Sequence, residues 1–361
     1  MEEKEGFRSA LKIQDGIIQP PNINPSVSKG GRKKKKKYST DEYVSGITSG
    51  NRTVLSQAIT LIESSLPEHY DVAQEIIEKC LPYSSGSVRI GITGVPGAGK
   101  STFIEAFGLY ATDHGRKLAV LTVDPSSEQT RGSILGDKTR MERLSVHPEA
   151  FIRPSPSAGT LGGVARKTRE TIILCEAAGF DTILVETVGV GQSETAVRTM
   201  VDFFLLLMLA GAGDELQGIK RGIIEMADTI AITKADGTNK TQAETARGLF
   251  QSALNLFPPV KSGWKPVVVT CSALYGTGIK ELWEIIGSYI RHSRESGYFE
   301  EVRKQQAVIR MNDTISEHLN NSFYGNEEVK ALIPMLEQKL RDGTVTSYRA
   351  AMELLKVYTG K

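Results

Sequence analysis

Short apolar runs alternate with amphipathic segments from residue 88 to about residue 295. The runs predict the strands Val88–Thr93, Leu118–Asp124, Thr182–Thr187, Phe203–Leu209, Thr229–Thr233 and Val267–Cys271. The segments with helical spacing predict the helices Lys100–His114, Val164–Ala178, Thr241–Leu256 and Ile279–Arg294. Apolar strands joined by helices predict an α/β fold, in which a mostly parallel sheet is covered by helices on both faces.

Helical segments flank this central region. The pattern STDE at residues 39–42 is a capping box, and apolar residues then recur at helical spacing up to a break at Leu66-Pro67. A second helix is expected over Val72–Leu81. Beyond residue 295 the chain is again helical and charged, and Pro334 predicts a helix start because proline fits the first helical position. The expected parts are a disordered basic tail (1–38), N-terminal helices (39–86), a main domain (87–294) and C-terminal helices (295–361). The C-terminal helices are expected either to pack on the main domain or to pair with a second copy as a dimerisation segment.

The charge of the chain is uneven. Residues 1–37 hold ten Lys or Arg and four Asp or Glu, a net charge of +6, which leaves −4 for the rest because the whole chain carries +2. Arg32–Lys37 could contact nucleic acid or anionic lipid. No aromatic residue interleaves these lysines, which favours a solvated tail without a nucleic-acid partner.

Composition excludes several protein classes. The longest apolar run, Phe203–Ala210, is far shorter than the roughly twenty residues of a membrane span, so a buried strand is expected there. The acidic, non-apolar start of the chain argues against a secretory signal or transit peptide, and a cytoplasmic location is expected. Cys80, Cys175 and Cys271 are too few and too scattered for a disulfide framework or a zinc site, so each is expected in the core.

The strongest local signal is GVPGAGKS at Gly94–Ser101, which fits the P-loop pattern G-x-x-x-x-G-K-[ST]. Its glycines let successive backbone N–H groups surround a phosphate. Lys100 would reach the β- and γ-phosphates, and Ser101 would bind Mg²⁺. An expected strand precedes the loop and an expected helix follows it, which is the context that a P-loop needs. The residues expected at the phosphates are Gly94, Val95, Pro96, Gly97, Ala98, Gly99, Lys100, Ser101 and Thr102.

Two expected strands end in an acid, Asp124 and Glu186. Carboxyl ends of parallel strands share one edge of a sheet, so both acids should lie near the P-loop. There they could bind Mg²⁺ directly or through water. Either acid alone could merely cap a turn or helix, but the two together favour function. Gly189 could let a backbone N–H approach the γ-phosphate and thereby sense its presence.

A candidate base-recognition loop, AITKADG at Ala231–Gly237, follows a later strand; we call it the base loop. Asp236 can accept hydrogen bonds from guanine N1–H and N2–H₂, and the aliphatic stem of Lys234 can cover the base. Thr233 stands where an Asn is usual; it keeps a hydroxyl but loses the reach of an amide. Guanine preference is expected to survive this change. After the next strand, a backbone N–H could meet guanine O6 from one of Ser272, Ala273 and Leu274.

Longer stretches add a family resemblance. They are VDPSS (123–127), GSILGDKTRM (132–141), FIRPSPSAGTLGG (151–163), ETVGVGQSE (186–194) and GDELQGIKRG (213–222). With the P-loop and the base loop, over about residues 50 to 295, they resemble the methylmalonyl-CoA mutase-associated GTPases, once described as arginine/ornithine transport ATPases or kinases. The resemblance implies a homodimeric P-loop GTPase that binds GTP and GDP. It also implies a chaperone that binds adenosylcobalamin-dependent methylmalonyl-CoA mutase, gates cofactor loading and helps to protect or reactivate that enzyme.

The same resemblance implies roles for individual residues. An acidic cluster around the metal and the attacking water would consist of Asp124, Asp137 and Glu186. Gln217 and Lys220 lie in the loop that matches the family's third switch, which moves when the mutase is engaged. A mobile Lys220 could neutralise charge that develops on the phosphates, whereas the residues alone would indicate a solvated surface loop. Gln192 is another candidate for orienting water.

Three alternatives remain open. A small-molecule kinase of the arginine type, or a transport-associated ATPase, would need a substrate pocket, and no separate substrate domain is evident. A non-catalytic nucleotide-dependent scaffold is disfavoured by the intact P-loop lysine and strand-end acids. A nickel-insertion GTPase tends to carry His-rich or Cys/His motifs. The histidines here are isolated in the sequence: His69, His114, His147, His292 and His318.

Overall fold

A computed structural model of the chain describes residues 38–64, 66–123, 141–154, 161–187, 193–211, 221–258 and 260–360. The chain divides into the units Met1–Ser39 and Thr40–Lys361. Residues Thr40–Lys361 contain the sheet, the candidate nucleotide site and the C-terminal helices.

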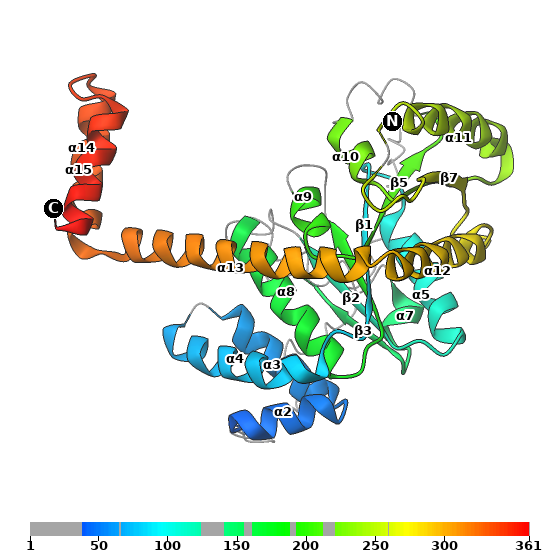
Figure 1. The fold of residues 1–361 in the computed structure, drawn as a ribbon, viewed down its shortest axis with the longest axis horizontal. Helices are drawn as coiled ribbons and strands as arrows, with labels where there is room; N and C mark the ends of the chain where they lie inside the picture. Colours follow the sequence, from blue (N-terminus) through cyan, green and yellow to red (C-terminus); the bar gives the residue numbers. More distant parts are fainter. Residues whose placement is uncertain are drawn as a thin grey trace, which may run out of the picture. The chain divides into compact units, whose positions relative to one another are not determined.

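In the described part of the chain, seven parallel strands form one sheet in the order β3-β2-β4-β1-β5-β6-β7 (Figure 1). The strands are β1 (Val88–Gly94), β2 (Leu118–Val123), β3 (Ala150–Arg153), β4 (Thr182–Thr187), β5 (Phe203–Leu209), β6 (Thr229–Thr233) and β7 (Val267–Thr270). The predicted α/β fold is confirmed, and each of the six predicted strands is present. The edge strand β3 (AFIR) was not predicted because, unlike the equally short β7 (VVVT), it is not a run of β-branched residues.

Helices cover both faces of this sheet. They are α5 (Lys100–Asp113), α7 (Glu142–Ser145), α8 (Leu161–Ala177), α9 (Ser193–Arg198), α10 (Arg221–Met226), α11 (Lys240–Leu254) and α12 (Ile279–Glu295). Alternate strand residues serve opposite faces: Ile90 and Ile92 belong to the core cluster with Phe107 of α5. On the other face, a Cβ at Gly91 would lie 3.0 Å from Val197 Cγ1 of α9. The sheet therefore has apolar contacts on both sides, as a parallel sheet requires.

Three N-terminal helices, α2 (Thr40–Thr48), α3 (Arg52–Glu63) and α4 (Pro67–Cys80), pack together and against α8 (Figure 1). Asn51 caps α3, because its side chain accepts hydrogen bonds from the N–H groups of Thr53 and Val54. The predicted break at Leu66-Pro67 is confirmed. However, α4 begins at Pro67 rather than at Val72, because proline is accommodated at the first helical position. A short 3₁₀ helix, η1 (Leu81–Tyr83), leads to β1.

The C-terminal helices are α13 (Tyr298–Gly325), α14 (Glu327–Arg341) and α15 (Ser347–Thr359). The helix start predicted at Pro334 is wrong, because Pro334 lies inside α14. The helix instead begins after Asn326, whose side chain accepts hydrogen bonds from the N–H groups of Glu328 and Val329. Proline has no N–H to donate to the carbonyl of residue 330, four positions earlier. Because Pro334 is exposed, that carbonyl can bond to water instead.

The longest apolar run lies in β5, whose residues are buried apart from the last, as expected for an internal strand. Within the described ranges, no helix is both long enough and apolar enough to cross a bilayer. The three cysteines are also in the core, as predicted. Burial raises the pKa of the Cys80 thiol to about 11 and that of Cys271 to about 12.

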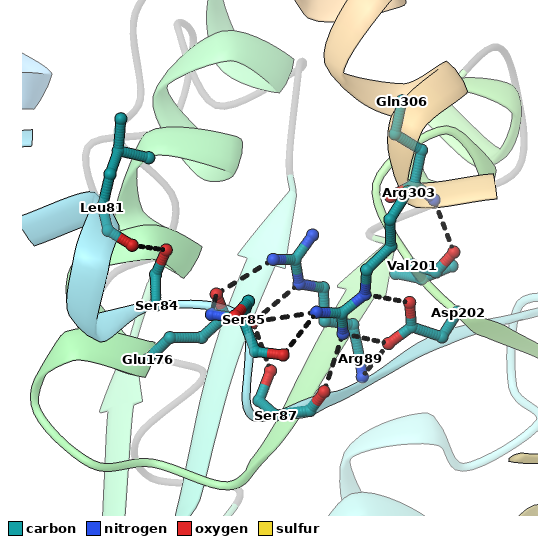
Figure 2. Close-up of polar contacts among 10 residues, drawn as sticks. All are labelled: Leu81, Ser84, Ser85, Ser87, Arg89, Glu176, Val201, Asp202, Arg303 and Gln306. Carbon is teal, nitrogen blue, oxygen red and sulfur yellow. Dashed lines mark hydrogen bonds and ion pairs between the residues drawn. The ribbon is translucent and has the colours of Figure 1, made fainter. Parts of the chain in front are cut away.

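Buried ion pairs join α13 and α8 to the sheet at the amino-terminal ends of β1 and β5 (Figure 2). Arg303 of α13 donates to both carboxylate oxygens of Asp202, at 2.9 and 2.7 Å, and to the carbonyl groups of residues 85 and 87. Arg89 of β1 donates to both oxygens of Glu176 in α8, at 2.9 Å each. Burial by itself raises the pKa of Glu176, but the charge and hydrogen bonds of Arg89 hold it below its ordinary value.

Replacing Arg303 by Leu is expected to lower the free energy of unfolding by about 3 kcal/mol, because it removes the guanidinium from a buried carboxylate. The Asp202 side chain is only 1% exposed, so water cannot replace the lost partner. Urea denaturation measures the effect. The matched variant Arg291→Leu removes an exposed arginine and should cost less than about 0.5 kcal/mol. Equal losses in the two variants would contradict the prediction.

Candidate nucleotide site

The loop between β1 and α5 has the backbone of an anion site. Gly97 and Gly99 both have φ of +80°, a conformation that glycine adopts without the penalty of a side chain. A Cβ at Gly94 would lie 2.4 Å from the carbonyl oxygen of Leu207 in β5, so the neighbouring strand excludes a side chain there. The free N–H groups of the first turn of α5 follow directly, and they favour a phosphate.

Lys100 spans this loop. Its Nζ donates a hydrogen bond of 2.9 Å to the carbonyl of Gly94, the first residue of the loop. The amine is half-buried, and burial lowers the pKa of Lys100. The carboxylates of Glu186 and Glu194 act in the opposite direction and favour its charged form. Lys100 therefore has a loop carbonyl as its hydrogen-bond partner and two carboxylates that favour its charge.

Glu186 lies near the end of β4, beside the P-loop strand. It is opposite Ile92 of β1 and Thr122 of β2 in the strand register, and it is only 4% exposed. The next residue, Thr187, donates its hydroxyl hydrogen to the Thr93 hydroxyl at 2.8 Å, which joins β4 to β1 just before the loop. The sheet thus brings the predicted acid to the same edge as Lys100.

Thr233 joins the base loop to the P-loop. Its hydroxyl lies 2.8 Å from the carbonyl oxygen of Ala98 and 3.1 Å from that of Met208, and it can donate to either. The side chain is 3% exposed. A hydroxyl at this position is therefore long enough to brace the two loops without the amide of an Asn.

Lys234 and Asp236 are held by neighbouring loops. Lys234 has φ of +55°, and its Cε is 3.9 Å from the position of a Cβ built on Gly99, so its stem lies along the P-loop. Asp236 Oδ2 accepts a 2.5 Å hydrogen bond from the Ser272 hydroxyl, which orients the carboxylate. The Ser272 side chain is buried, Ala273 is partly buried and Leu274 is 75% exposed.

This combination of a P-loop and a base loop hydrogen-bonded to it agrees with the similarity of the chain to known proteins. The family model described as "Methylmalonyl Co-A mutase-associated GTPase MeaB" matches residues 55–328. The chain belongs to this GTPase family. It is therefore a GTPase, which hydrolyses GTP to GDP and phosphate.

Similar proteins with names support the assignment to the MeaB family. The Mus musculus protein "Methylmalonic aciduria type A homolog, mitochondrial" is 43% identical over 367 residues, which cover 99% of this chain and 86% of that protein. "GTPase ArgK" of Escherichia coli (strain K12) is 48% identical over 287 residues, with coverages of 80% and 87%. The solved structure named "LAO/AO transport system kinase" has a TM-score of 0.71 and 37% identity, with coverages of 90% and 99%.

Several predicted site residues of this MeaB-family chain lie outside the described residues: Asp124, Asp137, Gly189, Gln192, Gln217 and Lys220. Their roles stay predictions. The others surround one edge of the sheet, where Ser101 and Thr102 occupy the first turn of α5 and Val95 and Ala98 are buried.

Two residues near the site were not predicted. Glu194 lies in the first turn of α9, is fully buried and favours the charged form of Lys100. In the sequence it looks like an ordinary acid in the first turn of a helix. Asn239, in the 3₁₀ helix η2 (Gly237–Asn239), donates its side-chain amide to the Lys234 carbonyl at 2.7 Å. The position of Asn239 just after the base loop was the signal in the sequence by which it could have been found.

Replacing Thr233 by Val is expected to weaken GDP binding about five- to tenfold, because a buried carbonyl loses its hydrogen bond while side-chain volume is kept. Isothermal titration with GDP and Mg²⁺ measures this. The matched variant Thr233→Ser keeps the hydroxyl and should bind GDP within about twofold of the parent chain. Unchanged affinity in Thr233→Val would show that the brace does not support nucleotide binding.

Proposed function

We propose that this MeaB-family GTPase binds methylmalonyl-CoA mutase and uses GTP hydrolysis to time adenosylcobalamin loading and the protection or reactivation of that enzyme. The family match over residues 55–328 carries the proposal, because the family is described by its association with the mutase. The brace between the P-loop and the base loop supports GTP as the timer, since it would couple phosphate and base recognition.

The proposed cofactor is Mg²⁺ with GTP or GDP. Ser101 and Glu186 offer the oxygen ligands that Mg²⁺ prefers, directly or through water. Among the described residues, no three or more His, Cys, Asp or Glu side chains form a metal cluster. Mg²⁺ usually keeps several waters and binds phosphate oxygens together with one or two carboxylates. When bound, Mg²⁺ would neutralise phosphate charge, while Lys100 would donate to the β- and γ-phosphates. Asp124, Asp137, Gln192, Gln217 and Lys220 are proposed to complete the site.

A homodimer is also part of the proposal. Four apolar side chains on α13 follow helical spacing and are about half exposed: Val308, Met311, Ile315 and Leu319. A stripe of this kind favours burial against another chain, and we assign it to a second copy. Changing Met311 and Ile315 together to Lys should yield a monomer in light scattering, whereas a dimer that persists would place the contact elsewhere. A cytoplasmic location remains part of the proposal.

The direct test is phosphate release from GTP and from ATP, each with and without methylmalonyl-CoA mutase. Slow hydrolysis of GTP that the mutase accelerates, with little use of ATP, is the expected result. A Lys100→Ala variant in the same assay excludes contaminating hydrolases. A rate of GTP hydrolysis that does not change when the mutase is added would contradict the chaperone role but not the GTPase activity. Transfer of phosphate to arginine, measured in parallel, would instead support the kinase alternative.

A further inference from the structure

A cavity of about 190 Å³ lies near the amino-terminal ends of β1 and β5, at the opposite end of these strands from the P-loop. Its walls come from α8, α13, the start of β1, η1 with the residues after it, and the segment between α9 and β5. Four arginines line it, Arg89, Arg169, Arg303 and Arg310, and we call it the arginine pocket. Among the described residues that line the pocket there is no Asp or Glu. Figure 2 shows two of these arginines with their partners.

The arginines exceed their acidic partners by one. Arg89 pairs with Glu176 and Arg303 with Asp202, as described above. Arg169 donates to Asp313 of α13 at 2.5 Å. No described residue forms a hydrogen bond or ion pair with the Arg310 guanidinium. One arginine charge in the pocket therefore has no direct acidic partner.

Buried hydrogen-bonding groups in the same pocket are also unused. Arg169 is 7% exposed, and its buried Nε has no hydrogen-bond partner among the described residues. Gln306 is 8% exposed; its Nε2 donates to the Val201 carbonyl at 2.8 Å, whereas its Oε1 accepts from no described residue. Buried polar groups in native proteins nearly always have partners, so these two atoms indicate a missing donor and a missing acceptor.

The surroundings of Arg310 agree with this interpretation. Burial and the positive charges of Arg89 and Arg169 lower the pKa of Arg310, and the carboxylates of Glu170 and Glu176 offset only part of the effect. An anion in the pocket would relieve this repulsion. The volume is below that of sites for drug-sized ligands, so a nucleotide would not fit. Apolar walls at Ile172 and Met200 suit a short carbon chain.

We propose that the arginine pocket binds a small hydroxycarboxylate. Its carboxylate accepts hydrogen bonds from Arg169 Nε and from the Arg310 guanidinium, and its hydroxyl donates to Gln306 Oε1. Such a ligand touches both α8 and α13, so its binding tightens the attachment of the C-terminal helices to the sheet. The site is separate from the P-loop, and the proposal does not depend on the identity of the client enzyme.

The test uses the full chain with its nucleotide site filled by GDP and Mg²⁺, so that the P-loop cannot take up the added anion. Malate, succinate and inorganic phosphate are titrated in turn by calorimetry. Malate should bind saturably at one site per chain. Succinate, which lacks the hydroxyl, should bind about fivefold more weakly, and phosphate, which lacks a carbon chain, should also bind more weakly than malate.

Variants then locate the site. Arg310→Gln should weaken malate binding about tenfold or more, because it removes a charged donor. Lys304→Gln removes the same charge from an exposed position of α13 outside the pocket and should change binding less than twofold. Without ligand, Arg310→Gln should melt at the same or a higher temperature than the parent chain, since it removes a repelling charge.

Five results would overturn the proposal. Absence of saturable malate binding, or equal losses in Arg310→Gln and Lys304→Gln, would exclude the site. A lower melting temperature for ligand-free Arg310→Gln would make this arginine a structural residue. Tighter binding of phosphate than of malate would show that the pocket recognises a phosphate rather than a carboxylate. Equal binding of succinate and malate would show that Gln306 does not recognise the ligand hydroxyl.

Discussion

Replacing Lys100 by Ala is expected to lower kcat for GTP hydrolysis about 10²- to 10³-fold, the usual loss when one preorganised donor to developing charge is removed. The amine is already held over the loop by its 2.9 Å hydrogen bond to the Gly94 carbonyl. Two neighbouring carboxylates, Glu186 and Glu194, favour its charged form. Binding of a phosphate therefore requires only that Nζ exchange one oxygen partner for another.

Single-turnover hydrolysis at saturating GTP separates this effect from weaker binding. The matched variant Lys280→Ala removes an exposed lysine of α12, whose ammonium is 3.7 Å from Glu284, and should retain nearly full activity. Circular dichroism and thermal melting of both variants check that the fold is kept. If Lys100→Ala hydrolyses GTP within about threefold of the parent rate, Lys100 does not contribute to the reaction.

Replacing Asp236 by Asn is the second large change, and it should weaken GDP binding about 100-fold. A carboxylate offers two acceptors to the two donors of guanine, N1–H and N2–H₂. An amide offers one acceptor and one donor, which matches xanthine, because xanthine carries a carbonyl in place of the 2-amino group. The variant should therefore bind XDP better than GDP and reverse the order of the parent chain.

Competition against a fluorescent nucleotide with GDP, XDP and ADP measures this reversal. Ser272 donates its hydroxyl hydrogen to Asp236 Oδ2, so an Asn side chain would have its carbonyl oxygen held in the same place. Asp113→Asn, at an exposed position at the end of α5, is the matched control and should leave the order GDP over XDP unchanged. Equal binding of GDP and ADP by the parent chain would show that the base loop does not discriminate bases.

Local patterns predicted most of the fold. The six predicted strands and the helices α5, α8, α11 and α12 follow from apolar runs and helical spacing, because both depend on residues close in the sequence. The shorter helices α7, α9 and α10 were not predicted. The edge strand β3 was missed because its four residues, unlike those of β7, are not a run of β-branched residues, and its strand character depends on pairing with β2. Pro334 was wrongly placed at a helix start, because the Asn326 cap and the packing of α14 on α15 outweigh one proline.

The candidate site was predictable where the motif itself lies in one stretch. The P-loop and the base loop could be found in this way, and the resemblance to the MeaB family rested on several such stretches. The proximity of Glu194 to Lys100 could not be found, since nearly a hundred positions separate the two residues. Nor could the bond of Thr233 to Ala98, because it joins two loops that meet only at the edge of the folded sheet.

The sequence by itself therefore determined the fold class, the phosphate loop, the base loop and the family. The tertiary structure decided which side chains share an environment: Thr233 with the P-loop, Glu194 with Lys100, and four arginines around one pocket. The physical reason is that backbone conformation and apolar periodicity are local properties, whereas burial, charge pairing and unused hydrogen bonds depend on segments brought together by folding.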